Sequence, residues 1–394
     1  MQPGFYSTLS NADYHGGPGE SKSLLDLVRR SPAHYRARKL SANDNEATEA
    51  QKTGTAFHAL LLEPQEFVKT YCLALRPQDV DTKGAPLVES REQLVAMVED
   101  LNKTRLPKLS SSGTKEELVA RILEAESGET VARKTPEELQ AMKGTELKDY
   151  ISHLNASRPG LLSTTGTMPQ LAQLLADAGR PVVLWSDVKA QWLQNNPGRQ
   201  VLELEEWDQL HQMRDAVMAH PAARALLTGA PGVAEHSVYW RDPATGLLCR
   251  CRPDFWRADG IVVDLKTTTD ASPEGFARSI AGWRYHVQAP FYLDGIACAQ
   301  DQARGSLPAY AQARPKAFVF LAVEKGARVV DGVALGVGVY VLDEESMAIG
   351  RQEYAEDLAT IAQCQKSGKW PGYSERIEPI SLPRWKKAQA DQAA

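Results

Sequence analysis

The chain has 394 residues, of which 43% are hydrophobic and 24% are charged. This composition is typical of a folded globular protein and excludes a chain that is disordered throughout. Its 45 basic and 50 acidic residues give a net charge of −5. That balance disfavours a protein that coats nucleic acid nonspecifically, but it permits a local DNA-binding patch.

The sequence predicts a cytoplasmic protein with no membrane partner. The first residues, 1–14, lack the basic and apolar regions of a secretory signal, and no stretch reaches the length of a membrane span. The five cysteines are odd in number and form no pair of CxxC motifs. Reduced thiols are therefore favoured over a zinc or iron–sulfur site.

The predicted elements alternate between helices and strands. A helix is expected over 22–38 with Ser21 as its N-cap and a bend at Pro32, and a second helix follows Gly54 and stops near Pro64. Later elements are a helix over 205–227, strands over 236–240, 247–256 and 261–267, a helix over 284–295, strands over 316–323 and 333–342, and a helix over 344–366. This order indicates an α/β fold.

The middle of the chain contains an internal duplication. Residues 93–125 align without a gap to residues 146–178 at a constant offset of 53. The identical pairs include Leu94 and Leu147, Leu101 and Leu154, Asn102 and Asn155, Arg105 and Arg158, Leu109 and Leu162, Gly113 and Gly166, and Leu118 and Leu171. Each copy predicts a helix, an extended loop and a second helix. Because one copy is too small for a stable core, the copies should pack on each other or on the main domain.

A predicted β-hairpin carries the sharpest chemical signal. Asp-Gly at 259–260 lies between two strand-like runs, and a three-residue loop, 258–260, would place Gly260 in the left-handed conformation. That register sets Asp254 opposite Asp264, on one face with Lys266, whereas Leu265 points away.

Two adjacent carboxylates repel each other unless a cation lies between them. Mg²⁺ is the natural hard cation for such a pair, and it can activate a bound water for attack on a phosphoryl group. Lys266 could orient that water or stabilise the developing charge. The alternative is a surface Asp–Lys pair without function.

Four further residues are candidates for the same site. His58 follows Gly54 on a helix and could supply a third metal ligand, whereas Glu63 is a weaker candidate that could simply end the helix. Gln288 and Tyr292 share one helix face and could hydrogen-bond a phosphate or the scissile backbone. In each case the alternative is an ordinary packed side chain.

The series GxxxH, PD, DxK and QxxxY occurs in this order and resembles the PD-(D/E)xK nuclease superfamily. The chain is most similar to its RecB-like branch and to the RecE-type phage and prophage exonucleases (exodeoxyribonuclease VIII). The similarity extends over about residues 1–85 and 190–387. The further matching segments are 3–6, 11–15, 21–23, 31–35, 54–64, 235–240, 370–373 and 382–385.

This resemblance implies a nuclease core with a mixed central sheet flanked by helices. It implies a magnesium-dependent exonuclease, with Mn²⁺ as a substitute, that digests double-stranded DNA ends 5′ to 3′ and leaves 3′ single strands for phage-type recombination. The implied metal ligands are His58, Asp254, Asp264 and the Leu265 carbonyl, with Glu63 and Glu235 as additional candidates. The implied catalytic residues are Asp254, Asp264 and Lys266, supported by Gln288 and Tyr292. The implied partners are DNA ends, a single-strand annealing protein and further copies of the chain in a ring.

The duplicated segment interrupts this family pattern as a small all-α helix–extended-loop–helix insertion. Its first copy resembles a SAP or HeH module, which suggests DNA binding through Lys103, Arg105, Lys108 and Lys115. The second copy has Met168 where the first has Lys115. A protein-interaction or purely structural insertion is the alternative.

The expected organisation is a nuclease domain formed by 1–87 and 181–387, an insertion at 88–180 and a tail at 388–394. A structure-specific or sequence-specific endonuclease of the same superfamily and a non-catalytic DNA-binding or scaffold protein are the alternative functions.

Overall fold

The computed structural model describes residues 1–41, 48–126 and 134–381. The chain forms two compact units, one from Met1–Leu73 together with Arg199–Ala394 and the other from Ala74–Gly198. The second unit is therefore wider at both ends than the expected insertion at 88–180. The expected tail at 388–394 and the matching segment 382–385 lie outside the described residues.

The elements of the first unit alternate between helices and strands. In chain order they are β1 (Gly4–Tyr6), α1 (Asn11–Gly16), α2 (Lys22–Arg30), α3 (Pro32–Leu40), α4 (Glu49–Leu62), α5 (Pro64–Thr70), β2 (Tyr71–Leu73), β5 (Gln200–Leu202), α12 (Leu204–Ala219), α13 (Pro221–Thr228), β6 (Gly232–Ala234), β7 (Ser237–Arg241), β8 (Leu248–Cys251), β9 (Phe255–Arg257), β10 (Ile261–Thr268), α14 (Pro273–Gly282), α15 (Tyr285–Gln302), η2 (Ala309–Ala311), β11 (Ala317–Val330), β12 (Val333–Tyr340) and α16 (Glu344–Ser367). None of the described helices combines the length and the apolar character needed to cross a bilayer.

The core of this unit is a mixed sheet of five strands in the order β12-β11-β10-β9-β6. Strands β10 and β11 are parallel, and the other neighbours are antiparallel. A three-stranded sheet has the order β1-β7-β8, and β2 pairs with β5. The mixed sheet with flanking helices is the predicted α/β architecture.

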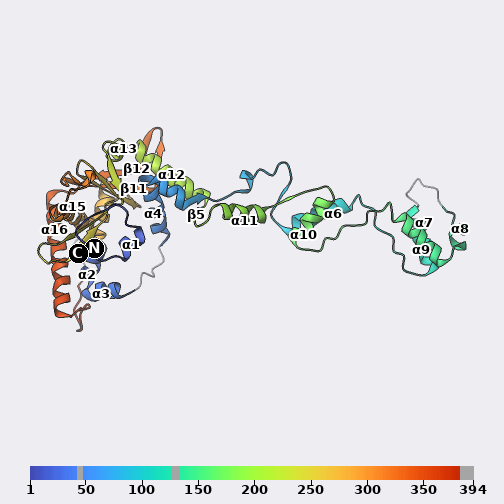
Figure 1. Ribbon diagram of the computed structural model, residues 1–394, viewed down its shortest axis with the longest axis horizontal. Coiled ribbons are helices and arrows are strands. Elements are labelled where there is room, and N and C mark those ends of the chain that lie inside the picture. Colours follow the sequence, from blue (N-terminus) through green and yellow to red (C-terminus); the bar gives the residue numbers. More distant parts are fainter. Residues whose placement is uncertain (42–47, 127–133, 382–394) are drawn as a thin grey trace, which may run out of the picture. The chain divides into compact units, whose positions relative to one another are not determined.

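Strand β10 is buried on both faces, and its side chains alternate between two hydrophobic cores. Val262 packs into a core shared with α2, α15 and α16, whereas Val263 and Leu265 pack into a second core shared with α4 and α12. Figure 1 shows these two sets of helices on either side of the strands. Because successive side chains of a strand point to opposite faces, the DxK motif sends Asp264 and Lys266 toward one core and Leu265 toward the other.

Prolines explain why three of the predicted elements are divided in the structure. The expected helix over 22–38 divides into α2 and α3 because Ser31 caps a new helix before Pro32. Ser21 precedes α2 in extended conformation without a side-chain capping bond. The expected helix over 205–227 likewise divides into α12 and α13, at His220 before Pro221. The expected strand over 247–256 divides into β8 and β9 around Pro253.

Two expected helix limits were wrong for reasons unrelated to proline. Helix α4 begins at Glu49, well before Gly54, because Thr48 and Gln51 form a capping box there. Helix α15 continues past Gly295 to Gln302. Gly295 serves packing rather than termination, because a Cβ at this position would lie 2.4 Å from the Trp240 ring.

The second unit consists mainly of short helices. Its elements are η1 (Pro77–Asp79), β3 (Leu87–Val88), α6 (Arg91–Asn102), α7 (Lys115–Glu126), α8 (Pro136–Ala141), α9 (Gly144–Leu154), α10 (Met168–Asp177), β4 (Val183–Leu184) and α11 (Trp185–Asn195). The parallel pairing of β3 with β4 brings the two ends of the duplicated segment together.

The two copies of the duplication exchange their helices. Helix α6 of the first copy packs against α10 of the second, around Leu94, Val98, Leu171 and Leu175. Helix α7 of the first copy packs against α9 of the second, around Leu118, Ile122, Leu147 and Ile151. Figure 1 shows α6 beside α10, and α7 with α8 and α9 in a separate cluster. Each hydrophobic cluster is therefore composite, with one helix from each copy.

The matched asparagines of the duplication fix this exchange. Asn102 donates to the Leu162 carbonyl at 2.9 Å and accepts from the Leu162 N–H at 2.8 Å. Asn155 makes the same pair of bonds with Leu109, at 2.9 and 2.7 Å. Each copy thus holds the extended segment of the other by two backbone bonds.

Candidate functional site

The β9–β10 hairpin positions the acids of the PD and DxK motifs. Trp256 pairs with Val262 and Phe255 with Val263, so the next position of this register sets Asp254 opposite Asp264. Gly260 has φ +89° in the turn, where a Cβ would lie 2.2 Å from the Arg314 carbonyl oxygen. The predicted register and the left-handed glycine are both confirmed. Asp254 itself lies just before β9, and its Oδ2 accepts a hydrogen bond from the Leu265 N–H at 2.6 Å.

Both oxygens of Asp264 are engaged by neighbouring side chains. Gln288 on α15 donates to Oδ1 at 2.6 Å, and the Lys266 ammonium forms an ion pair with Oδ2. Burial raises the pKa of Asp264 to about 6, against the opposing effect of Lys266. Burial alone would lower the pKa of Lys266, but the Asp264 and Asp254 carboxylates outweigh it and raise that pKa. Lys266 therefore stays protonated in its ion pair with Asp264, and Gln288 fixes the position of the Asp264 carboxylate.

A second group of side chains meets at Asp254. His58, Glu235 and Asp254 each offer a ligand atom, and these atoms all lie within 4.8 Å of one another. The His58 Nδ1 lies 3.7 Å from the Asp254 Oδ2. Helix α4 delivers His58 because its apolar face, with Phe57 and Leu60, packs into the core beneath β10.

Glu235 reaches this group through an unusual backbone conformation. It lies between β6 and β7 with φ +54°, which is rare for a residue with a side chain, and its N–H donates to the Asp254 carbonyl at 3.2 Å. Burial, followed by the Asp254 and Glu63 carboxylates, raises the pKa of Glu235 to about 8. Burial and the Lys266 ammonium lower the pKa of His58 to about 4. His58 is therefore neutral at physiological pH, with a ring nitrogen free of a proton.

This donor set fits a divalent cation. Two buried carboxylates whose pKa values are both raised, beside a neutral imidazole, are an arrangement that a bound cation would stabilise. His58, Glu235 and Asp254 would hold the ion. The Leu265 backbone, which hydrogen-bonds His58, borders the same group. Asp264, an expected metal ligand, adjoins the group but directs its oxygens to Gln288 and Lys266.

Tyr292 and Glu63 occupy less direct positions. Tyr292 is on α15 one turn beyond Gln288, and its ring packs edge-on against Phe318 at 5.8 Å. Burial raises its pKa well above the usual range, with smaller contributions from neighbouring acids that include Asp264. Glu63 ends α4 and precedes α5, and burial raises its pKa. Both residues thus border the acidic group without a hydrogen bond to it among the described contacts.

Two buried arginines of the β8 segment escaped the sequence analysis. Arg252 donates to the Ser237 hydroxyl at 2.9 and 2.7 Å and to the Leu9 carbonyl at 2.8 Å, and it lies over the Tyr14 ring at 4.3 Å. Arg250 donates to the Tyr14, His15 and Gly17 carbonyls. These contacts explain the matching N-terminal segment 11–15 as an anchor on the strand that leads to Asp254. The only sign of this role in the sequence is the position of Arg252 directly before the PD motif.

The basic residues expected to bind DNA in the insertion have different environments. Lys103, Lys108 and Lys115 are exposed. Arg105 instead donates to the Gly160 carbonyl at 2.7 Å and to the Pro159 carbonyl at 3.2 Å, so it joins the extended segments of the two copies. Its counterpart Arg158 is buried and donates to the Pro107 carbonyl at 3.2 Å. Arg105 therefore has a structural use that its sequence did not reveal.

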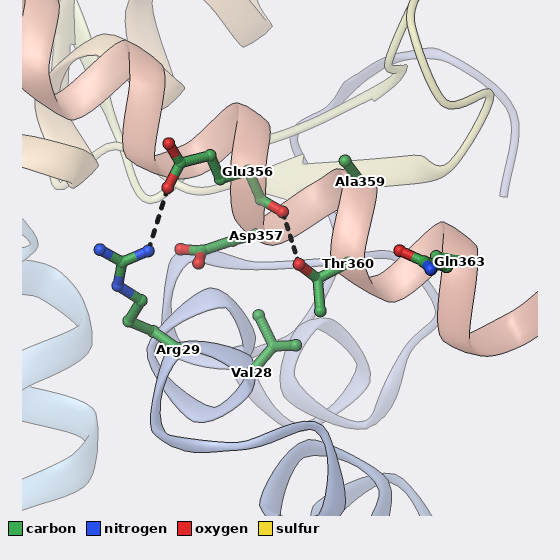
Figure 2. Close-up of a pocket in the computed structure, with 7 residues that line it drawn as sticks. All are labelled: Val28, Arg29, Glu356, Asp357, Ala359, Thr360 and Gln363. Carbon is green, nitrogen blue, oxygen red and sulfur yellow. Dashed lines mark hydrogen bonds and ion pairs between the residues drawn. The ribbon is translucent and has the colours of Figure 1, made fainter. Parts of the chain in front are cut away.

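A pocket of about 500 Å³ lies elsewhere in the first unit, between α2 and α16. Figure 2 shows Arg29 reaching across it to Glu356, an ion pair of 3.1 Å, with Asp357 alongside. Asp357 is in turn bound by Arg284 at 2.7 Å. Because its charged groups already neutralise one another, this pocket offers no reactive group comparable to the Asp254 site.

The raised pKa of Glu235 predicts a pH-dependent stability of the metal-free protein. The folded state retains a proton that the unfolded chain loses near pH 4.5, so stability falls as pH rises through about 8. Glu235→Gln should remove this contribution and raise Tm at pH 8.5, by roughly 2–4 °C for each kcal/mol of repulsion relieved. Thermal melts at pH 5.5 and 8.5 in a chelator measure the effect. Equal Tm differences between variant and wild type at both pH values would contradict it.

Comparison with known proteins places this core in a family. A search of curated proteins finds no match. Among solved structures, the chain is similar to the crystal structure of a “Putative exonuclease” from Eubacterium rectale, with 11% identity over 62% of this chain and 84% of that one. With a TM-score of 0.31, this similarity is too slight to bear on function. The model of the PDDEXK-like domain of unknown function (DUF3799) matches residues 185–383, a span with Glu235 and both acidic motifs. The chain therefore belongs to the family of PDDEXK-like domains of unknown function.

Proposed function

We propose that this protein is a Mg²⁺-dependent deoxyribonuclease that degrades linear double-stranded DNA from its ends. The observation that carries the proposal is the meeting of His58, Glu235 and Asp254 beside the Asp264–Lys266 ion pair. Such a site combines a cation-binding donor set with a fixed ammonium group. Phosphodiester hydrolysis needs both, because negative charge develops on the phosphoryl oxygens and on the leaving oxygen.

Each side chain has a distinct task in this proposal. His58, Glu235 and Asp254 would hold Mg²⁺ or Mn²⁺, and the ion when bound would activate a water and polarise the phosphodiester. Lys266 keeps its proton and can stabilise charge on the attacked phosphoryl group or orient the water. Gln288 holds Asp264 in place, and Asp264 in turn holds Lys266 through their ion pair.

The direction and biological role rest on the similarity to RecE-type exonucleases. That similarity supports 5′ to 3′ digestion, which exposes a 3′ single strand for an annealing protein in phage-type recombination. It also supports a ring-shaped homo-oligomer around DNA. The anchoring of segment 11–15 by Arg250 and Arg252 gives one of the matching segments a physical role beside the site.

Incubation with linear and circular duplexes of the same sequence in Mg²⁺ tests this function. Loss of the linear form alone, stopped by a chelator, is the expected result. Nicking or cutting of circles would favour the endonuclease alternative, and persistence of both forms would favour a non-catalytic DNA-binding protein. Duplexes labelled at the 5′ end or at the 3′ end of one strand measure the direction of digestion.

We further propose that the insertion adds nonspecific DNA affinity through Lys103, Lys108 and Lys115. Replacing these three exposed lysines with alanine should reduce the slope of log affinity against log salt by about 0.9 for each phosphate that the lysines no longer neutralise. Turnover at saturating DNA should remain near the wild-type value, because the proposed catalytic residues belong to the other unit. Arg105 is kept in this variant because its removal would disturb the extended segments. An unchanged slope would favour a protein partner or a structural role instead.

A further inference from the structure

Trp283 is an exposed aromatic side chain in a segment that leads directly to the site. It lies between α14 and α15, and 68% of its surface is exposed. Only Trp283 and Tyr373 among the aromatic residues of the described ranges are exposed to this degree. An indole left in water forfeits the favourable free energy of burial, so its display points to a partner that covers it.

The backbone around Trp283 is held rigidly. Its N–H donates to the Ser279 carbonyl at 2.9 Å, and its own carbonyl accepts a hydrogen bond from the Lys22 ammonium. The next residue, Arg284, has φ +55° and is bound by Asp26, Glu353 and Asp357 at 3.1, 2.8 and 2.7 Å. The exposed ring therefore projects from a fixed support and not from a pliable loop.

The same support adjoins the proposed catalytic lysine. The ring of Tyr285, two residues beyond Trp283, lies 4.9 Å from the Lys266 ammonium and 5.6 Å from the Lys22 ammonium. Lys22, at the start of α2, is also paired with Asp26 at 2.7 Å. Trp283, Lys22 and Tyr285 thus form a ledge beside Lys266, with the Lys22 ammonium at the Trp283 carbonyl and both ammonium groups over the Tyr285 ring.

We infer that this ledge binds the end of the DNA strand that enters the site, with Trp283 stacked on an unpaired nucleobase. The inference rests on the proposed nuclease function. A nucleobase fits the observations because its flat face matches the indole, while the ammonium groups of Lys22 and Lys266, over the neighbouring Tyr285 ring, can bind the phosphates of the same strand. The stacking is tolerant of sequence, as an enzyme that digests any DNA end requires.

The test uses full-length protein with Asp254→Asn, which should bind DNA without cutting it, and a duplex whose terminal unpaired base is 2-aminopurine. Stacking quenches the fluorescence of this base. Trp283→Ala should abolish the quenching and weaken binding roughly 5- to 150-fold, whereas Trp283→Phe should retain part of both. Tyr373→Ala is the matched control. Tyr373 is 71% exposed, and its contact with Arg30 lies at the opposite end of α2 from Lys22.

Kinetics with the active protein separate the outcomes. Trp283→Ala should raise KM for overhanging ends by the same factor while kcat stays within about two-fold, because Trp283 touches no reacting atom. Wild-type quenching and KM in Trp283→Ala, with DNA digestion intact, would overturn the ledge alone. Wild-type protein that neither binds nor digests DNA would overturn the proposed function as well.

Discussion

Replacing Lys266 with methionine should lower kcat for DNA cleavage by about 10²–10⁴-fold while metal uptake persists. The ammonium is the cation that the fold fixes beside the acids, through its ion pair with Asp264 and its position over Tyr285. Methionine keeps a long side chain against Tyr285 but removes the charge. The group formed by His58, Glu235 and Asp254 would keep its ligand atoms, and the loss of a neighbouring positive charge favours a bound cation.

Single-turnover cleavage and calorimetric titration with Mn²⁺ measure the two effects separately. Lys316→Met is a matched control, because Lys316 lies 3.6 Å from Asp259 at the turn end of the same hairpin. It should cleave DNA at the wild-type rate. Loss of Mn²⁺ uptake in Lys266→Met would show that Lys266 is structural, and a wild-type rate would remove it from catalysis.

Deleting one copy of the duplication should convert the insertion into a dimerisation module. Removing 91–143 joins Ser90 to Gly144, so that α9 takes the sequence position of α6. The remaining helices, α9 and α10, belong to different hydrophobic clusters, and each loses its partner from the first copy. Helices of this length are marginal alone, so each needs a new partner.

A second chain can supply both partners at once. The extended segment 156–167 holds the two helices of one copy apart, and its bonds to the other copy, such as Gly160 N–H to the Leu106 carbonyl at 3.1 Å, require two such segments side by side. Two shortened chains can restore this arrangement. The number of chains per particle, taken as the mass from light scattering divided by the mass of one chain, should therefore be twice that of a variant that lacks the whole unit 74–198. An equal number of chains per particle in the two variants would show that one copy closes on itself.

Sequence patterns predicted the parts of the fold that depend on local chemistry. Gly260 and the Asp-Gly turn predicted the hairpin register, because few residues tolerate a left-handed turn position. The offset of 53 likewise revealed the duplication. The helix exchange was not predictable, because matched residues such as Leu94 and Leu147 make equivalent contacts whether a copy closes on itself or on its neighbour. Sequence similarity between the copies therefore cannot distinguish the two arrangements.

The candidate site was predicted in composition more than in arrangement. His58, Asp254, Asp264, Lys266 and Gln288 do converge, although they are far apart in the chain. The pattern gave no indication that Gln288 and Lys266 would occupy both oxygens of Asp264, since this depends on the approach of α15 to β10. It also gave no reason to prefer Glu235, because its left-handed backbone precedes β7 without a glycine or asparagine to signal it.

The first unit is assembled from both ends of the chain, which has a consequence during protein synthesis. Helix α4 carries His58, but the core beneath it consists of side chains from α12, β10 and β11. At about 5–20 residues per second, roughly 10–40 s separate the emergence of His58 from that of Lys266. The insertion can fold on the ribosome in this interval, while α4 waits for its core. A nascent chain that ends before residue 235 therefore carries only His58 of the three proposed metal ligands and lacks the proposed catalytic Lys266, so we expect no nuclease activity from such an incomplete product.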